Sequence, residues 1–231
     1  MKNSKFIAVI LSALMVLSGC NMNNTTKGGL IGGGGGAAVG ALVGNLIGHN
    51  TKGTAIGAAI GAAVGTGAGV LIGKKMDKAK AAAEAVKNAQ VETITDANGL
   101  QAVKVTFDSG ILFATNKADL NSTAKNTLNQ FAANVLTVNP DMDVAILGHT
   151  DNTGTDAINN PLSLQRAQSV SNYLKNQGVA AKQLKTVEGL GSTQPVADNS
   201  TADGRQQNRR VEVYIYASEE MIKAAENGTL K

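Results

Sequence analysis

The chain is poor in the residue types that build metal and disulfide sites. It has one cysteine, Cys20, two histidines, no tryptophan and only 3% aromatic residues. A single cysteine excludes an intrachain disulfide. His49 lies in a glycine-rich stretch and His149 is the other histidine, so a catalytic zinc site near His149 would have to rely on carboxylates. We therefore expect neither a metal nor a cofactor.

Strong charge of one sign is also missing. The formal net charge is +4 over 231 residues. The lysines and arginines are scattered, apart from a short cluster at Lys74, Lys75, Lys78 and Lys80. A nucleic-acid-binding protein usually gathers basic residues on one face or helix. Nucleic acid is therefore not an expected partner.

The first residues have the layout of a secretory signal peptide. Lys2 and Lys5 precede an apolar run from residue 6 to residue 17, and small residues follow. The ending Leu17-Ser18-Gly19-Cys20 resembles the bacterial lipobox, which implies a signal peptide over 1–19 and acyl chains, palmitate among them, on Cys20. Asn21 follows the cysteine where Asp favours inner-membrane retention in the lipoprotein pattern. The resemblance implies a lipid-anchored protein of the cell outer membrane that faces the periplasm, with residues 20–27 as its lipidated linker.

Glycine recurs at every fourth position in two consecutive segments. It occupies 28, 32, 36, 40, 44 and 48, and then 53, 57, 61, 65, 69 and 73. Positions four apart share one ridge of an α-helix, so each segment would carry a bare stripe that lets a second backbone approach closely. Such a helix is roughly 30 Å long, close to the thickness of a bilayer core. The pattern predicts a helical hairpin over 28–73, followed by a connecting helix over 74–90.

A flexible glycine-rich linker is the alternative for this region, and the run of five glycines at 32–36 favours it locally. The strict spacing elsewhere favours the hairpin, which resembles the glycine-zipper segments of bacterial outer-membrane lipoproteins. The sequence does not decide whether the hairpin spans a bilayer, lies against one or forms oligomers.

The remaining pattern predicts one α/β (α+β) domain over 91–217 and a tail over 218–231. A β-hairpin is expected on either side of the turn candidate at 96–99, and a helix capped by Asn121 or Ser122. Next come a buried strand over 142–148 and a helix with Pro161 at its first position. They are followed by a short strand over 185–190 and by an antiparallel strand over 209–217 with one exposed face. The order βαβαββ predicts a two-layer sandwich with the helices on one face of a mixed sheet.

Residues 148–167 contain five side chains that could take part in catalysis, metal binding or ligand binding: His149, Asp151, Asp156, Ser163 and Arg166. A Ser-His-Asp triad is disfavoured because no nucleophile elbow surrounds Ser163. A pocket at a strand end remains, in which Asp151 could meet a cation and Arg166 a carboxylate. Pairing of Asp151 with Arg166 is the structural alternative, and spacing alone does not choose between them.

Five stretches resemble the OmpA-like peptidoglycan-binding domain: FATNKADL (113–120), GHTDNTG (148–154), NNPLSLQRAQSV (159–170), VEGLGSTQPVADNST (187–201) and GRQQNRRVEV (204–213). The resemblance implies non-covalent binding of diaminopimelate in the peptidoglycan stem peptide, with Asp151 facing the ammonium group and Arg166 the carboxylate. Asn116, Thr150 and Asn159 match positions that complete the pocket. Arg209 and Arg210 are typical of the family, but the resemblance does not assign them to ligand or to fold.

The sequence therefore predicts a non-enzymatic tether between outer membrane and cell wall. Its partners would be peptidoglycan, outer-membrane lipid and further copies of the chain. The alternative hypothesis is an oligomeric membrane channel or envelope-assembly component built by the glycine zipper and positioned by wall binding. An enzyme acting on the wall is disfavoured because the sequence offers no credible nucleophile or metal set.

Overall fold

The computed structural model describes residues 67–95, 101–114 and 116–230. All of them belong to the second of two compact units of the chain, residues 34–231. Cys20, most of the glycine repeat and the turn candidate at 96–99 lie outside the described residues. The predictions that concern them therefore stay predictions.

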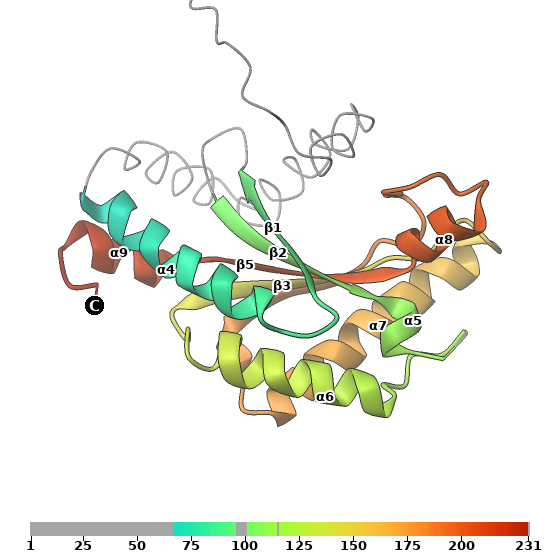
Figure 1. Ribbon diagram of the computed structural model, residues 1–231, viewed down its shortest axis with the longest axis horizontal. Helices are drawn as coiled ribbons and strands as arrows, with labels where there is room; N and C mark the ends of the chain where they lie inside the picture. The colour runs from blue at the N-terminus through green and yellow to red at the C-terminus, as the bar shows by residue number, and fades with distance from the viewer. Residues whose placement is uncertain (1–66, 96–100, 115, 231) are drawn as a thin grey trace, which may run out of the picture. The chain divides into compact units, whose positions relative to one another are not determined.

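The centre of the domain is a five-stranded mixed sheet with the order β1-β2-β5-β3-β4 (Figure 1). The strands are β1 (Gln90–Thr95), β2 (Gln101–Asp108), β3 (Met142–Gly148), β4 (Leu184–Gly189) and β5 (Arg210–Ala217). The central strand, β5, is antiparallel to both β2 and β3, whereas β4 is parallel to β3. The predicted hairpin is present as the antiparallel pair β1 and β2.

The longer helices pack their apolar sides on one face of this sheet. They are α4 (Gly67–Glu84), α6 (Ser122–Phe131), α7 (Asp156–Asn176) and α9 (Glu219–Glu226), and a π-helical turn (Ala132–Leu136) extends α6. Asn121 caps α6 as predicted, since its side chain accepts a hydrogen bond of 2.8 Å from the backbone N–H of Ala124. Phe107 of β2 meets Phe131 of α6 edge to face, with ring centroids 5.4 Å apart. The expected two-layer α/β sandwich is confirmed.

Helix α4 joins the end of the glycine repeat to the core of the domain. It continues through Gly73 without interruption, and Ile72, Met76, Ala79 and Ala83 on its inner side are all buried. Burial of each large apolar side chain contributes about 1.5–3 kcal/mol. The helix is thus part of the folded domain, although among the described helices none is long and apolar enough to cross a bilayer.

The helix expected to start at Pro161 begins earlier, and that prediction is wrong. The backbone N–H groups of Ile158 and Asn159 already donate to the carbonyl oxygen of Thr155, so α7 starts at Asp156 and Pro161 lies inside it. Proline fixes a φ compatible with a helix, so it can be accommodated near the start of a long helix at the loss of one hydrogen bond. Gly178, with a φ of +90°, follows the helix end as predicted.

Two further expectations need correction at the end of the chain. The exposed-face strand over 209–217 is the central strand β5, and all of its residues are buried, including Glu212, Tyr214 and Tyr216. The residues after it, expected as a tail, contain α9, whose Met221 and Ile222 belong to the main core. Three short helices were not predicted: α5 (Ser109–Leu112), α8 (Ala202–Asn208) and a 3-10 turn (Ala181–Gln183).

Candidate functional site

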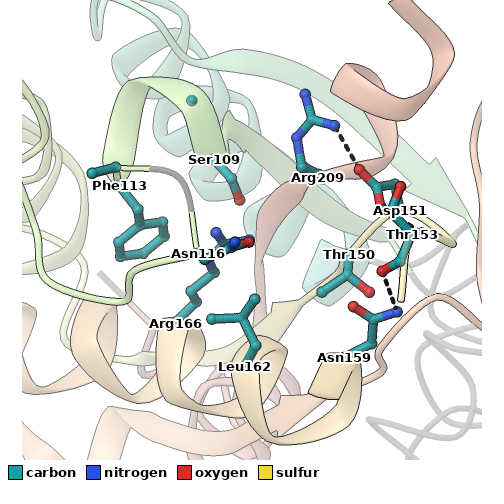
Figure 2. Close-up of a pocket in the computed structure, with 12 residues that line it drawn as sticks. Ser109, Phe113, Asn116, Thr150, Asp151, Thr153, Asn159, Leu162, Arg166 and Arg209 are labelled. Atoms are coloured by element: carbon teal, nitrogen blue, oxygen red, sulfur yellow. Dashed lines mark hydrogen bonds and ion pairs between the residues drawn. The ribbon is translucent and has the colours of Figure 1, made fainter. Parts of the chain in front are cut away.

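A cleft of about 450 Å³ opens at the end of the sheet where β3 finishes and β5 begins. Its walls come from α5 and the loop after it, from the loop between β3 and α7, from the first half of α7, and from Arg209 just before β5 (Figure 2). The lining residues are Ser109, Gly110, Phe113, Ala114, Asn116, Thr150, Asp151, Thr153, Asn159, Leu162, Arg166 and Arg209. All five residues that the sequence nominated for the pocket are among them.

Asp151 supplies the negative charge of the cleft. Its Oδ1 accepts a hydrogen bond of 2.8 Å from the backbone N–H of Thr153, and its Oδ2 lies 2.5 Å from Nη1 of Arg209. Burial favours the neutral acid, but the bonds from Arg209 and Thr153 outweigh it and hold the pKa of Asp151 below its ordinary value. Asp151 is therefore a carboxylate at neutral pH.

Arg166 lies across the cleft from Asp151, on α7, with Phe113 beside it. Its Nε donates to the carbonyl oxygen of Lys117 over 3.1 Å, and its guanidinium carbon is 5.3 Å from the centroid of the Phe113 ring. Burial and the nearby Arg209 lower the pKa of Arg166, and Asp151 partly opposes them. Neither Nη of Arg166 has a hydrogen bond to another residue in the part of the chain that the structure describes, so both can donate to a ligand.

Asp151 and Arg166 do not form an ion pair with each other. The partner of Asp151 is Arg209, while Arg166 is held by a carbonyl oxygen and a ring. The pairing that the sequence left open as an alternative is therefore absent. Arg209, which the sequence did not assign, belongs to the cleft.

The other nominated residues line the same cleft. Asn116 has a positive φ of 55°, a conformation that non-glycine residues seldom adopt and that often marks a functional loop. The Nδ2 atom of Asn159 donates to the carbonyl oxygen of Thr153 over 3.2 Å. The hydroxyls of Thr150 and Ser109 are buried and have no hydrogen-bond partner among the described residues. Ser109 was missed, because nothing in its local sequence shows that α5 closes one wall of the cleft.

Glycines at the ends of β3 and β4 let α7 reach this position. A Cβ atom at Gly148 would overlap the carbonyl group of Ser163, and one at Gly189 would overlap the backbone of Leu164. Ser163 itself completes the contact, since its Oγ donates to Asn160 and accepts from the N–H of Gly191 over 3.0 Å. This close approach fixes the first half of α7, and with it Asn159 and Arg166.

A buried group of polar side chains lies on the sheet face opposite the main core. Glu212 accepts from Nε of Arg210 over 2.7 Å and from the hydroxyl of Tyr214 over 2.6 Å, and Nζ of Lys104 lies 3.7 Å away. Nε2 of His149 is close to the same carboxylate but outside hydrogen-bond geometry. Arg210 also donates to the carbonyl oxygens of Asn208 and Gln194. We call Lys104, His149, Arg210, Glu212 and Tyr214 the β5 ion cluster. Arg210 thus serves the fold.

The catalytic alternatives find no support in this arrangement. The side chain of His149 points to the β5 ion cluster, while Ser163 bonds Asn160 and Gly191, so the triad residue types do not meet. Burial lowers the pKa of His149, which is neutral at pH 7. Within residues 67–95, 101–114 and 116–230, no group of three or more His, Cys, Asp or Glu side chains could hold a metal ion.

The sheet order, the helices on one face and a charged cleft at the strand ends define an α/β ligand-binding domain. Residues 112–209 match the model of the OmpA family, and residues 1–77 match that of the YMGG-like Gly-zipper. The chain thus contains an OmpA-family domain, and a glycine-zipper segment precedes it.

Curated relatives and a solved structure are each similar to part of the chain. Over 114 residues the chain is 44% identical to the peptidoglycan-binding protein ArfA of Mycobacterium tuberculosis, covering 49% of this chain and 34% of ArfA. Over 111 residues it is 42% identical to the outer-membrane lipoprotein YfiB of Pseudomonas aeruginosa, covering 48% of this chain and 65% of YfiB. The cell wall anchor of the T6SS from Pseudomonas aeruginosa superimposes with a TM-score of 0.51 and 30% identity, covering 62% of this chain and 97% of that one.

The chain spans only part of the length of these curated relatives. The matched region spans 34% of ArfA and 65% of YfiB, so the chain covers about a third to two thirds of these proteins.

Proposed function

We propose that the C-terminal domain binds peptidoglycan without covalent chemistry, and that acyl chains on Cys20 hold the N-terminal end in the outer membrane. The protein then tethers the membrane to the wall. The observation that carries this proposal is the cleft itself, in which Asp151 and Arg166 line opposite sides and are not paired with each other.

The ligand chemistry follows from these two charges. The free end of diaminopimelate carries an ammonium and a carboxylate on one carbon, so it can meet Asp151 and Arg166 together. A hydrogen bond to a charged group contributes about 1.5–3 kcal/mol when it is shielded from water. Asn116, Thr150 and Asn159 offer amide and hydroxyl groups around the same space. The names of the relatives ArfA and YfiB support the same class of partner and the same location.

Weak binding by one domain is sufficient for a tether. The wall presents many copies of its stem peptide, and lipid anchoring confines the protein to a thin layer beside it. The effective concentration of ligand is therefore high, and binding is strengthened without any new contact.

Sedimentation with purified sacculi tests the proposal. Asp151→Asn and Arg166→Gln remove one charge each with little change in volume, and either change should abolish co-sedimentation of the full-length chain. Lys117→Gln is the matched control, because it removes an exposed charge near the cleft while the backbone carbonyl that holds Arg166 stays in place. Unchanged co-sedimentation of both cleft variants, with circular dichroism equal to wild type, would contradict the proposal.

Membrane anchoring has a separate test. Cys20→Ser removes the only thiol of the chain. The variant should lose incorporation of labelled palmitate and leave the membrane fraction, while the domain still sediments with sacculi. Retention of the label by the variant would exclude Cys20 as the acylated residue.

A further inference from the structure

The charges of the cleft do not balance when a zwitterion occupies it. Among the described residues that line it, the charged side chains are Asp151, Arg166 and Arg209, which together carry a net charge of +1. A zwitterionic amino-acid end has a net charge of zero and leaves this excess in place. A ligand with one ammonium and two carboxylates would neutralise the cleft.

Arg209 has donors available for such a second carboxylate. Its Nη1 is engaged with Oδ2 of Asp151, but its other nitrogens make no hydrogen bond to any residue that the structure describes. Its side chain is 39% exposed, compared with 9% for that of Asp151. A planar guanidinium can hold a carboxylate through two parallel bonds, so Arg209 can keep Asp151 on one side and accept an anion on the other.

Arg209 also acts electrostatically on Arg166, the other cation of the cleft. Arg209 and Arg166 face the same space and repel each other, and this repulsion adds to burial in lowering the pKa of Arg166. Asp151 is the single anionic side chain among the described residues that line the cleft, which also include two guanidinium groups. An additional anion near Arg209 relieves the repulsion, while an additional cation alone would compete with Arg209 for Asp151.

On the basis of the proposed function, we propose that Arg209 is a specificity-determining residue that binds a second carboxylate, located one residue away from the zwitterionic end of the ligand. In a stem peptide the glutamate before diaminopimelate is linked through its side chain, so its α-carboxylate is free. The cleft thereby distinguishes stem peptides with a free glutamate carboxylate from those in which this group is an amide.

If Arg209 only positions Asp151, a different dependence of binding on the ligand is expected. In that case the loss of Arg209 would weaken binding of every ligand with an ammonium group, whatever group lies beside it. Binding of the second carboxylate requires instead that the effects of Arg209 and of that carboxylate depend on each other.

Calorimetric titration of the full-length chain in detergent micelles separates the two roles. The probes are the tripeptide L-alanyl-γ-D-glutamyl-diaminopimelate and the same tripeptide with the glutamate α-carboxylate amidated. We expect the wild type to bind the acid about tenfold more tightly than the amide, a difference of about 1.4 kcal/mol. Arg209→Gln should bind both peptides equally, and Lys117→Gln should keep the tenfold preference.

Equal dissociation constants for acid and amide in the wild type would overturn the inference, and so would a tenfold preference that survives in Arg209→Gln. In either case loss of binding by Asp151→Asn would leave the proposed function intact. If neither peptide binds the wild type, or if Asp151→Asn and Arg166→Gln bind both as the wild type does, the proposed function fails as well.

Discussion

Nε2 of His149 lies 3.3 Å from a carboxylate oxygen of Glu212, in the interior between the ends of β3 and β5. His149 directly precedes Thr150 and Asp151, and its backbone N–H donates to the carbonyl oxygen of Arg210 over 2.9 Å. The β5 ion cluster is therefore attached to the loop that presents the acidic side of the cleft. The stability of the cluster and the geometry of the cleft are linked through these few residues.

The first prediction concerns Glu212, the anion at the centre of that cluster. Glu212→Gln leaves the buried charge of Arg210 without its counter-ion, while Lys104 keeps Glu92 as a partner, so the free energy of unfolding should fall by about 3–5 kcal/mol. Urea denaturation followed by circular dichroism measures this loss. Glu188→Gln, on the exposed side of β4, is the control and should change stability by no more than about 0.5 kcal/mol. Equal stability of the two variants would show that the cluster is not a stabilising ion network.

The second prediction concerns the pH dependence contributed by Asp143. Burial raises the pKa of this carboxyl from 3.8 to about 6, although Nζ of Lys185 lies 3.7 Å away. Because the folded state binds the proton more tightly, the stabilising contribution is complete below pH 3.8 and is lost as pH rises to about 6. The free energy of unfolding of Asp143→Asn should therefore rise relative to that of the wild type as pH increases across this window. Above the window the difference between the two proteins should stay constant. With the partial exposure of the group taken into account, the plateau should be on the order of 1 kcal/mol.

Thermal melts of Asp143→Asn and wild type between pH 4 and pH 8 test this prediction. The quantity to compare is the difference between the two proteins, because it removes the titration of all other groups. A difference that does not change with pH would mean that Asp143 titrates normally in the folded protein.

The third prediction uses two glycines with opposite surroundings. Gly148→Ala would push a methyl group into the backbone of Ser163, so we expect a loss of about 1–3 kcal/mol and a displaced α7. Gly73 lies in α4 with nothing near its missing side chain, so Gly73→Ala should gain up to about 1 kcal/mol from helix propensity. Chemical denaturation of both variants measures the sign of the change in the free energy of unfolding for each. Two changes of the same sign would contradict the packing described for Gly148 or the helix described for Gly73.

The fourth prediction concerns Asp151, whose pKa is lowered chiefly by the bonds from Arg209 and Thr153 against the effect of burial. Arg209→Gln should raise the pKa of Asp151, because burial remains while one of the two opposing partners is lost. NMR titration of the Asp151 carboxyl carbon in both proteins measures the shift. Lys117→Gln should leave the titration unchanged, and an unchanged pKa in Arg209→Gln would mean that the ion pair is not populated in solution.

Much of the fold could be predicted from the sequence because its signals are local. The cap at Asn121, the buried run over 142–148 and the stop at Gly178 each depend on a few neighbouring residues, and each is confirmed. The start of α7 was misplaced because Pro161 is a common but not obligatory first residue of a helix. The alternation of β5 could not show its burial, since the β5 ion cluster brings together polar and charged side chains from β2, from the residue after β3 and from β5, which are distant in the sequence.

The cleft was predicted only in part, because the sequence shows local groups of residues but not contacts between distant segments. Asp151, Thr150, Asn159 and Arg166 lie within one segment, and the resemblance to the OmpA-like domain added Asn116. The partner of Asp151 is Arg209, 58 residues further along the chain, and spacing alone could not distinguish it from Arg166. Ser109 was missed because its place depends on how α5 folds back against the end of the sheet.

The entry of α4 into the core has a mechanical consequence. The first turn of α4 lies near α9, at one end of the long strands, whereas α5 and α8 lie at the other end (Figure 1). The cleft lies at that second end, because α5 and Arg209, which directly follows α8, line it. Tension between the glycine segment and a captured ligand would therefore act along β2, β5 and β3. Neighbouring strands loaded in this direction must slide past each other, and their hydrogen bonds resist together instead of opening one after another.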